Sequence, residues 1–295
     1  MYDFKELHEA GSVAEALKLT KEHPGALILA GGSDILIKLR EGKLAGCELI
    51  SIFGIDELRG ICLEEDGTIL IRPLTSFTAV STHPVIRQHI PVLGEAVDQI
   101  GGPQIRNIGT IGGNICNGVT SADSASTLKA YDAMLEITSA EGTRVLPFAE
   151  FNLGPGKVDL RAGELLTGIR IPKESWERTY GHYIKYAMRR AMDIATLGCS
   201  VNVRLSADKK KIERLRMAFG VAAPIPVRAH TAESTAEGQP IDEALLTRIA
   251  EAVIADITPR SSWRASKEFR LHLAKEIALR AVKAAVEKAG GSING

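Results

Sequence analysis

Cysteine is scarce in this chain of 295 residues, which has only Cys47, Cys62, Cys116 and Cys199. No two of them lie within four residues of each other, whereas structural zinc and iron–sulfur sites usually take two ligands from one tight turn. The seven histidines also form no pair with short metal-binding spacing. We therefore expect reduced, mostly buried thiols and no metal site.

Net charge and long apolar runs are also absent. The 36 basic side chains balance the 36 acidic ones, which argues against the basic surface of a nucleic-acid-binding protein. No run approaches the roughly 18 uncharged apolar residues that span a membrane. The first twenty residues mix acids and bases, unlike a signal peptide. We expect a cytoplasmic protein that binds neither nucleic acid nor membrane.

Several common catalytic and nucleotide-binding motifs are missing. There is no GxGxxG of a Rossmann fold and no GxxxxGK[ST] of a P-loop. Neither HExxH nor GxSxG occurs, so a zinc hydrolase and a serine nucleophile elbow are not indicated. The chain offers no recognisable general acid, general base or nucleophile.

Short apolar runs alternate with helical periodicity along the whole chain, which predicts an α+β protein of about two domains. Expected strands are 26–30, 49–52, 68–71, 199–205 and 215–221. Expected helices cover about 84–101, 122–131, a stretch after Asp242, and 266–289. A weaker seam lies near 172–178, where proline and charge interrupt the strand pattern.

The first candidate site is the turn AGGSD at 30–34, between an expected strand and an expected helix. Glycine lets a phosphate approach the backbone without an intervening Cβ, and successive N–H groups supply donors. A GG turn at such a place is often purely structural. The turn alone is therefore a weak signal.

The second candidate is the glycine-rich segment 101–115, with Gln104, Arg106, Asn107, Thr110 and Asn114 between its glycines. This composition predicts irregular backbone and a concave row of N–H donors that could hold an anion. Two such segments suggest a cleft that grips one pyrophosphate from both sides. A side chain at Gly112 or Gly113 is expected to block that approach.

A third constellation, at 185–194, carries Lys185, Arg189, Arg190 and Asp193. It is either a charged passage from strand to turn or a polar segment beside a redox ring, where nearby charge would tune the potential. The residues alone do not decide between these readings.

Together, AGGSD at 30–34, QIRNIGTIGGNICN at 104–117 with Asp123, and KYAMRRAMDIA at 185–195 resemble the FAD-binding subunits of molybdenum hydroxylases. The resemblance covers essentially the whole chain. It is closest to the flavin subunits of bacterial xanthine dehydrogenases, through GPGKV at 154–158, FGVAAPIPVR at 219–228 and PRSSWRASKEFR at 259–270. Some relatives carry clustered cysteines for an additional iron–sulfur cluster, and this chain has none.

The resemblance implies a two-lobed FAD-binding fold of the vanillyl-alcohol oxidase (PCMH) type, followed by a smaller α+β C-terminal domain. The FAD-binding domain would cover 1–176, with a seam between lobes near 55–60, and the C-terminal domain 177–295. Where xanthine oxidoreductases place an acidic residue in the loop after the lysine, this chain has Met192 beside Asp193.

The resemblance also assigns cofactor-binding residues. Two phosphate loops fall on Ala30–Ile35 and Thr110–Asn114, a sugar ligand on Asp123, an adenine contact on Leu166, and a lysine near the flavin on Lys185. The full expected set is Ile28, Leu29, Ala30, Gly31, Gly32, Ser33, Asp34, Ile35, Ile100, Thr110, Ile111, Gly112, Gly113, Asn114, Asp123, Leu166 and Lys185.

The function implied is electron transfer: FAD would pass electrons from a 2Fe–2S partner subunit to NAD+, while a molybdenum-cofactor subunit hydroxylates a purine. Alternatives are the flavin subunit of a related hydroxylase for another heterocycle or an aldehyde, a stand-alone FAD oxidoreductase, and a non-catalytic nucleotide-binding module. Arg260, Trp263 and Arg264 are candidate docking residues. Trp263 is equally expected to pack the C-terminal helix onto its own domain.

Overall fold

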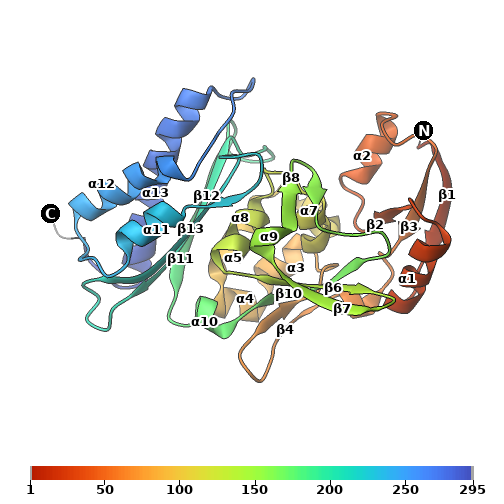
Figure 1. Cartoon of the computed structure of the whole chain (residues 1–295), viewed down its shortest axis with the longest axis horizontal. Coiled ribbons are helices and arrows are strands. Elements are labelled where there is room, and N and C mark those ends of the chain that lie inside the picture. The colour runs from red at the N-terminus through yellow and green to blue at the C-terminus, as the bar shows by residue number, and fades with distance from the viewer. Residues whose placement is uncertain (1, 294–295) are drawn as a thin grey trace.

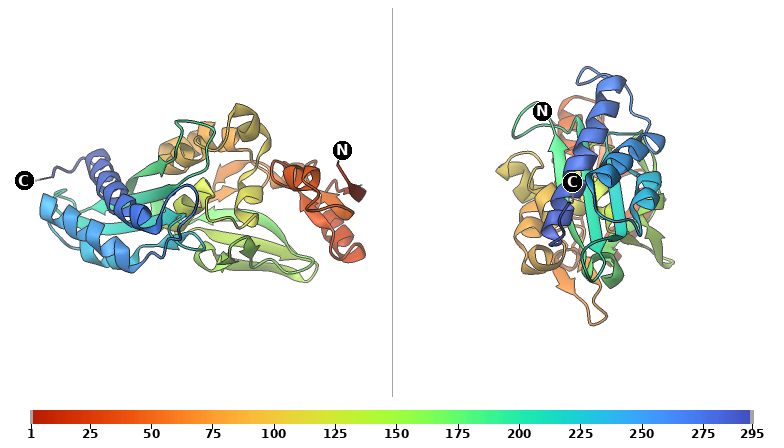
Figure 2. Two further views of the ribbon diagram at one scale, coloured as in Figure 1. Left: turned by 90° about the horizontal axis from the view of Figure 1, so that it is seen from above. Right: turned by 90° about the vertical axis from the view of Figure 1, so that its left-hand side faces the viewer.

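The computed structural model describes residues 2–293, in which three larger sheets follow one another along an elongated molecule and a fourth sheet has only two short strands (Figure 1). Figure 2 shows the same succession from above, with the N-terminal sheet at one end and the last helices at the other. None of the helices in residues 2–293 has the length and apolarity needed to cross a membrane.

The first sheet is parallel, with strand order β1-β3-β2. Its strands are β1 (Phe4–Glu9), β2 (Leu27–Leu29) and β3 (Cys47–Ser51), accompanied by α1 (Val13–Glu22) and α2 (Ile35–Arg40). Ser12 caps α1 by accepting from the backbone N–H of Glu15. The Ala30–Asp34 turn follows β2 directly, as the apolar run before it predicts.

The second sheet has the order β4-β5-β10-β6-β7 and is antiparallel. Its strands are β4 (Ile61–Leu63), β5 (Ile69–Ile71), β6 (Met134–Ser139), β7 (Gly142–Pro147) and β10 (Leu165–Ile171). Its helices and minor elements are η1 (Asp56–Leu58), α3 (Phe77–Thr82), α4 (Pro84–His89), α5 (Pro91–Val97), α6 (Pro103–Ile108), α7 (Ile111–Cys116), α8 (Asp123–Ala130), α9 (Phe148–Phe151), β8 (Asn152–Gly154), β9 (Lys157–Val158) and α10 (Lys173–Trp176).

Two expectations fail within this unit. The helix expected over 84–101 is divided into α4 and α5, because Pro91 lacks an N–H and begins a new helix instead of continuing the old one. The glycine-rich segment is not irregular but forms α6 and α7. Pro103 begins α6 and Thr110 caps α7, and these local signals outweigh the low helix propensity of glycine.

The third sheet is antiparallel, with the order β11-β12-β13-β14. Its elements are β11 (Tyr180–Tyr186), β12 (Leu197–Leu205), β13 (Ile212–Gly220), β14 (Val227–Arg228), α11 (His230–Ala236), α12 (Glu243–Ala252), η2 (Val253–Ala255) and α13 (Lys267–Lys288). Strand β12 is buried over nearly its whole length, because α13 contacts it and α8 of the preceding unit also contacts it. The last sheet therefore packs directly on the helices that follow the glycine segment.

Candidate functional site

The two glycine segments of the sequence meet in space. Gly31, after β2, lies so close to the end of α6 that a Cβ there would stand 1.9 Å from the carbonyl oxygen of Ile108. Any larger residue at 31 would force the two segments apart. The turn at 30–34 and the segment at 101–115 thus form neighbouring walls of one site.

These walls enclose a cavity of about 390 Å³. The residues that line it include Ile28, Ala30, Gly31, Gly32, Ser33, Asp34, Ile35, Ile100, Thr110, Gly112, Gly113, Asn114 and Leu166, all of them expected from the sequence. Four expected residues, Leu29, Ile111, Asp123 and Lys185, are not among the lining residues. The cofactor contacts of the whole set stay a prediction.

Backbone donors are unevenly distributed between the two walls. Within residues 2–293, the N–H groups of 31–35 donate to no protein acceptor. Those of Ile111, Gly112, Gly113 and Asn114 donate to Thr75 O, Pro73 O, Thr110 Oγ1 and Thr110 O at 2.8–3.1 Å. The first segment therefore offers five consecutive free donors for an anion, whereas four successive N–H groups of the second, 111–114, are used within the protein.

The expectation for Gly112 also needs correction. A Cβ at Gly112 would stand 2.4 Å from Cβ of Pro73 and 2.7 Å from its carbonyl oxygen. A side chain there would collide with the protein itself. A loss of flavin by such a variant could therefore not be distinguished from misfolding. At Gly113 the Cβ would instead approach the capping Oγ1 of Thr110, at 2.9 Å.

Lys38 is a lining residue that sequence reasoning missed. It is the only basic side chain among the residues that line the cavity. Its ammonium lies 2.5 Å from the Asp34 carboxylate and donates to Oδ1 of Asn117 at 3.2 Å. Asn117 follows α7, so Lys38 connects the two walls. The sequence could have indicated Lys38 through its four-residue spacing from Asp34, which places the two side chains next to each other on a helix.

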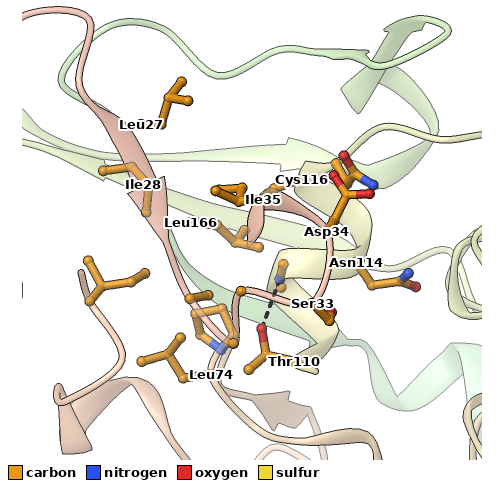
Figure 3. A pocket seen from close by; sticks show the side chains of 18 of the residues that line it. Leu27, Ile28, Ser33, Asp34, Ile35, Leu74, Thr110, Asn114, Cys116 and Leu166 are labelled. Carbon is orange, nitrogen blue, oxygen red and sulfur yellow. Dashed lines mark hydrogen bonds between the residues drawn. The ribbon is translucent and has the colours of Figure 1, made fainter. Parts of the chain in front are cut away.

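The rest of the cavity is mostly apolar. Figure 3 shows Ser33, Asp34 and Asn114 gathered at one end, whereas Leu27 and Ile28 lie at the other. A long ligand with a charged middle and flat apolar rings matches this division, because backbone N–H groups and Lys38 serve the charge and aliphatic side chains serve the rings.

Asp123 and Lys185 form a buried pair beside the cavity. The Lys185 ammonium donates to Oδ2 of Asp123 at 2.8 Å, and the Tyr183 hydroxyl donates to Oδ1 at 2.6 Å. Burial raises the pKa of Asp123, and Lys185 and Tyr183 oppose that rise. Lys185 also donates to the carbonyl of Gln99, the residue before Ile100 in the lining. The pair thus sits just behind the cavity wall.

The loop that follows Lys185 is organised around Asp193. The Asp193 carboxylate accepts from the backbone N–H groups of Arg189 and Ile194, each at 2.9 Å. Although burial raises the pKa of Asp193, these bonds bring it below its ordinary value. Met192 has a positive φ of 54° and lies against Gly102 of the glycine segment. The loop therefore covers the start of the second wall.

Comparisons with known proteins agree with this geometry. Residues 2–174 match the family described as the FAD binding domain in molybdopterin dehydrogenase, and residues 182–285 match the CO dehydrogenase flavoprotein C-terminal domain. The chain is 46% identical to the xanthine dehydrogenase FAD-binding subunit of Escherichia coli O157:H7, over 99% of this chain and 100% of that protein. It is 31% identical to the carbon monoxide dehydrogenase medium chain of Hydrogenophaga pseudoflava, over 95% and 96% of the two chains.

Solved structures show the same fold. A chain of carbon monoxide dehydrogenase from H. pseudoflava superposes with a TM-score of 0.92 at 30% identity, covering 98% of this chain and 99% of that one. A chain of quinoline 2-oxidoreductase from Pseudomonas putida superposes with a TM-score of 0.90 at 25% identity, covering 97% of this chain and 98% of that one. The fold is therefore the α+β, PCMH-type FAD domain with a C-terminal domain, and the chain belongs to the FAD-binding subunits of the molybdenum hydroxylase family, as an oxidoreductase component.

Proposed function

We propose that this chain is the electron-transfer subunit of a xanthine dehydrogenase-like molybdenum hydroxylase, accepting electrons from a 2Fe–2S partner subunit and delivering them to NAD+. The observation that carries the proposal is the cavity of about 390 Å³ where the two glycine segments meet, with its free N–H donors and its apolar end. The 46% identity to a xanthine dehydrogenase subunit supports the purine branch.

The residues present fit FAD. The pyrophosphate would lie against the free N–H groups of 31–35 and the Lys38 ammonium, with Thr110 and Asn114 opposite. The aliphatic side chains of the cavity, Leu166 among them, would cover a ring. When bound, FAD supplies the redox chemistry, including the change from single electrons to hydride.

The chain's own residues bind and orient the cofactor and shield it from water. Asp123 and Lys185 act from behind the wall: they hold each other with the help of Tyr183, and so fix α8 against β11. We propose that they contribute through this placement and, for Lys185, through a positive charge beside the cavity.

Docking of the partner subunits is proposed at the loop and helix start around Trp263. The structure leaves Trp263 76% exposed, with the Arg264 guanidinium 4.2 Å from its ring. The alternative, that Trp263 packs the C-terminal helix onto its own domain, is therefore wrong. Phe269, Tyr186 and Ile194 are also exposed large apolar residues. Exposed tryptophan and arginine of this kind are typical of interface hot spots.

We also propose domain boundaries and a cellular location for this chain. A division into 1–176 and 177–295, with a seam near 55–60, is supported by the fact that no sheet crosses those points in the described residues. A cytoplasmic location suits the four free cysteines, which lie in no disulfide.

The test uses the purified chain loaded with FAD, then mixed with the molybdenum and iron–sulfur chains of the same complex. Alone, it should oxidise NADH with an artificial dye as acceptor and should not oxidise purines. The complete complex should reduce NAD+ with a purine, and Trp263→Ser should weaken assembly without changing FAD content. Purine oxidation by this chain alone, or a complex that works with the FAD-free chain, would overturn the proposal. Preference for an aldehyde or another heterocycle would reassign the substrate.

A further inference from the structure

A second group of chemically active side chains lies outside the cavity, at the N-terminal sheet. His8 on β1, His23 just after α1 and Glu48 on β3 each offer one donor atom, and these three atoms lie within 4.8 Å of one another. None of the three lines the cavity. Within residues 2–293, no other group of three or more His, Cys, Asp or Glu side chains comes this close.

The fold explains why residues distant in sequence meet here. Strands β1 and β3 are parallel, with Glu6 opposite Glu48 and His8 opposite Ile50, so these side chains share one face of the sheet. The end of α1 brings His23 over that face, where its ring lies 3.8 Å from the His8 ring, centroid to centroid. Such a meeting leaves no trace in short sequence spacing.

The polar atoms of the cluster are only partly used. Nδ1 of His23 lies 3.2 Å from Oε2 of Glu48, whereas Lys5 contacts the other carboxylate oxygen. Nε2 of His8 is buried and has no hydrogen-bond partner. A buried ring nitrogen without a partner costs free energy unless a ligand or a proton satisfies it.

Charge in the cluster also suits a cation. Lys5 contacts one oxygen of the Glu48 carboxylate, and the other oxygen faces His23. The carboxylate of Glu6 lies 3.9 Å from Nε2 of His8 and adds a second negative charge. The side chains of His8, His23 and Glu48 are 13%, 28% and 22% exposed, which leaves room for water to complete a coordination sphere.

We propose that His8, His23 and Glu48 bind a divalent transition ion of the zinc type. Two imidazoles and one carboxylate are the ligands that Zn2+, Co2+ and Ni2+ accept, and three protein ligands leave a position for water. Ca2+ and Mg2+ prefer oxygen ligands throughout and are excluded by the two nitrogens. The site would fasten the end of α1 to β1 and β3, next to the chain segment that enters β2.

The experiment uses the full chain without a histidine tag, freed of metal by a chelator and then dialysed against Zn2+ alone. The wild type should bind one Zn2+ per chain, gain thermal stability with Zn2+, and give a visible d–d absorption with Co2+. Glu48→Gln and His23→Asn should each weaken Zn2+ binding by more than about tenfold and lose the Zn2+-dependent gain in Tm, because a three-ligand site loses a ligand.

His272→Asn is the matched control, since His272 is an exposed histidine outside the cluster; it should bind Zn2+ as the wild type does. Circular dichroism confirms that each variant folds. No stoichiometric Zn2+ on the wild type, equal binding by Glu48→Gln, or equal loss in His272→Asn would each overturn the proposal.

Discussion

The ammonium of Lys185 and the carboxylate of Asp123 hold each other at 2.8 Å, with side chains only 6% and 5% exposed. Sequence resemblance assigns these residues separately, one to the flavin ring and one to a sugar. In the structure they form one unit with Tyr183 behind the cavity wall. Their first effect is therefore on the packing of α8 against β11.

Lys185→Met should strongly destabilise the chain. The change leaves the buried Asp123 carboxylate without its cation, and breaking a buried pair in this way typically costs about 3–5 kcal/mol. Denaturant unfolding measures the free energy difference. Lys210→Met, in the exposed turn between β12 and β13, serves as control and should unfold like the wild type. The double variant Lys185→Met with Asp123→Asn should recover part of the loss; a loss equal to the sum of the single changes would show that the two side chains do not interact.

Lys38→Met should weaken FAD binding without unfolding the protein. A charge-assisted contact of about 1.5 kcal/mol corresponds to roughly a tenfold change in Kd. Titration of the metal-free, flavin-free chain with FAD, followed by flavin fluorescence, gives the Kd. Lys21→Met, an exposed lysine on α1, should leave the Kd unchanged. An unaltered Kd in Lys38→Met would place the pyrophosphate elsewhere.

Gly31→Ala should separate the two walls of the cavity. The new Cβ would stand 1.9 Å from Ile108 O, so the backbone must shift, at a cost of about 1–3 kcal/mol. We expect a lower FAD-to-protein ratio after gel filtration and a lower Tm. Gly154→Ala is the control, because nothing lies within 4 Å of a Cβ there and its φ is not positive. Full FAD retention by Gly31→Ala would contradict the close approach of the two segments.

Glu95 on α5 should make stability sensitive to acid. His182 of β11 and Lys288 of α13 donate to its carboxylate at 3.0 and 2.6 Å. Although burial raises the pKa of Glu95, these two partners lower it from 4.5 to about 2. A lowered carboxylate pKa stabilises the fold above the unfolded value, and that stabilisation is lost as pH falls from 4.5 towards 2. Because solvent partly screens these charges, we expect the ionised Glu95 to add about 1–2 kcal/mol to the free energy of unfolding at neutral pH.

Urea unfolding at pH 7 and at low pH tests this. Glu95→Gln should be less stable than the wild type at pH 7, and the difference should shrink as the pH approaches the pKa of about 2. Glu150→Gln, at an exposed glutamate, should show no such change. A pH-independent difference for Glu95→Gln would mean that its charge plays no part.

Local signals predicted much of the fold. Asp242 and Ser266 cap α12 and α13 by accepting from N–H groups three residues on, and each helix continues with the expected apolar spacing. The expected strands 199–205 and 215–221 correspond to β12 and β13, which pair across a turn of polar residues. All of these depend on contacts between near neighbours in sequence.

Contacts between distant residues escaped prediction. Nothing near Gly112 indicates that Pro73 fills the space beside it, and nothing near Lys38 indicates Asn117. His8 and His23 meet only because β1 and β3 are parallel and α1 returns over them. The sequence identified which segments form the cavity, but which of their N–H groups are free depends on the tertiary contacts.

The order of the cavity residues along the chain bears on how the protein is made. All of them lie between Leu27 and Leu166, whereas β11, the Asp193 loop and the exposed Trp263 come later. Domains generally fold as units during synthesis, the N-terminal one first. A ribosome thus releases every residue of the proposed FAD cavity before it translates the proposed docking surface. FAD can therefore begin to bind before the partner subunits can dock.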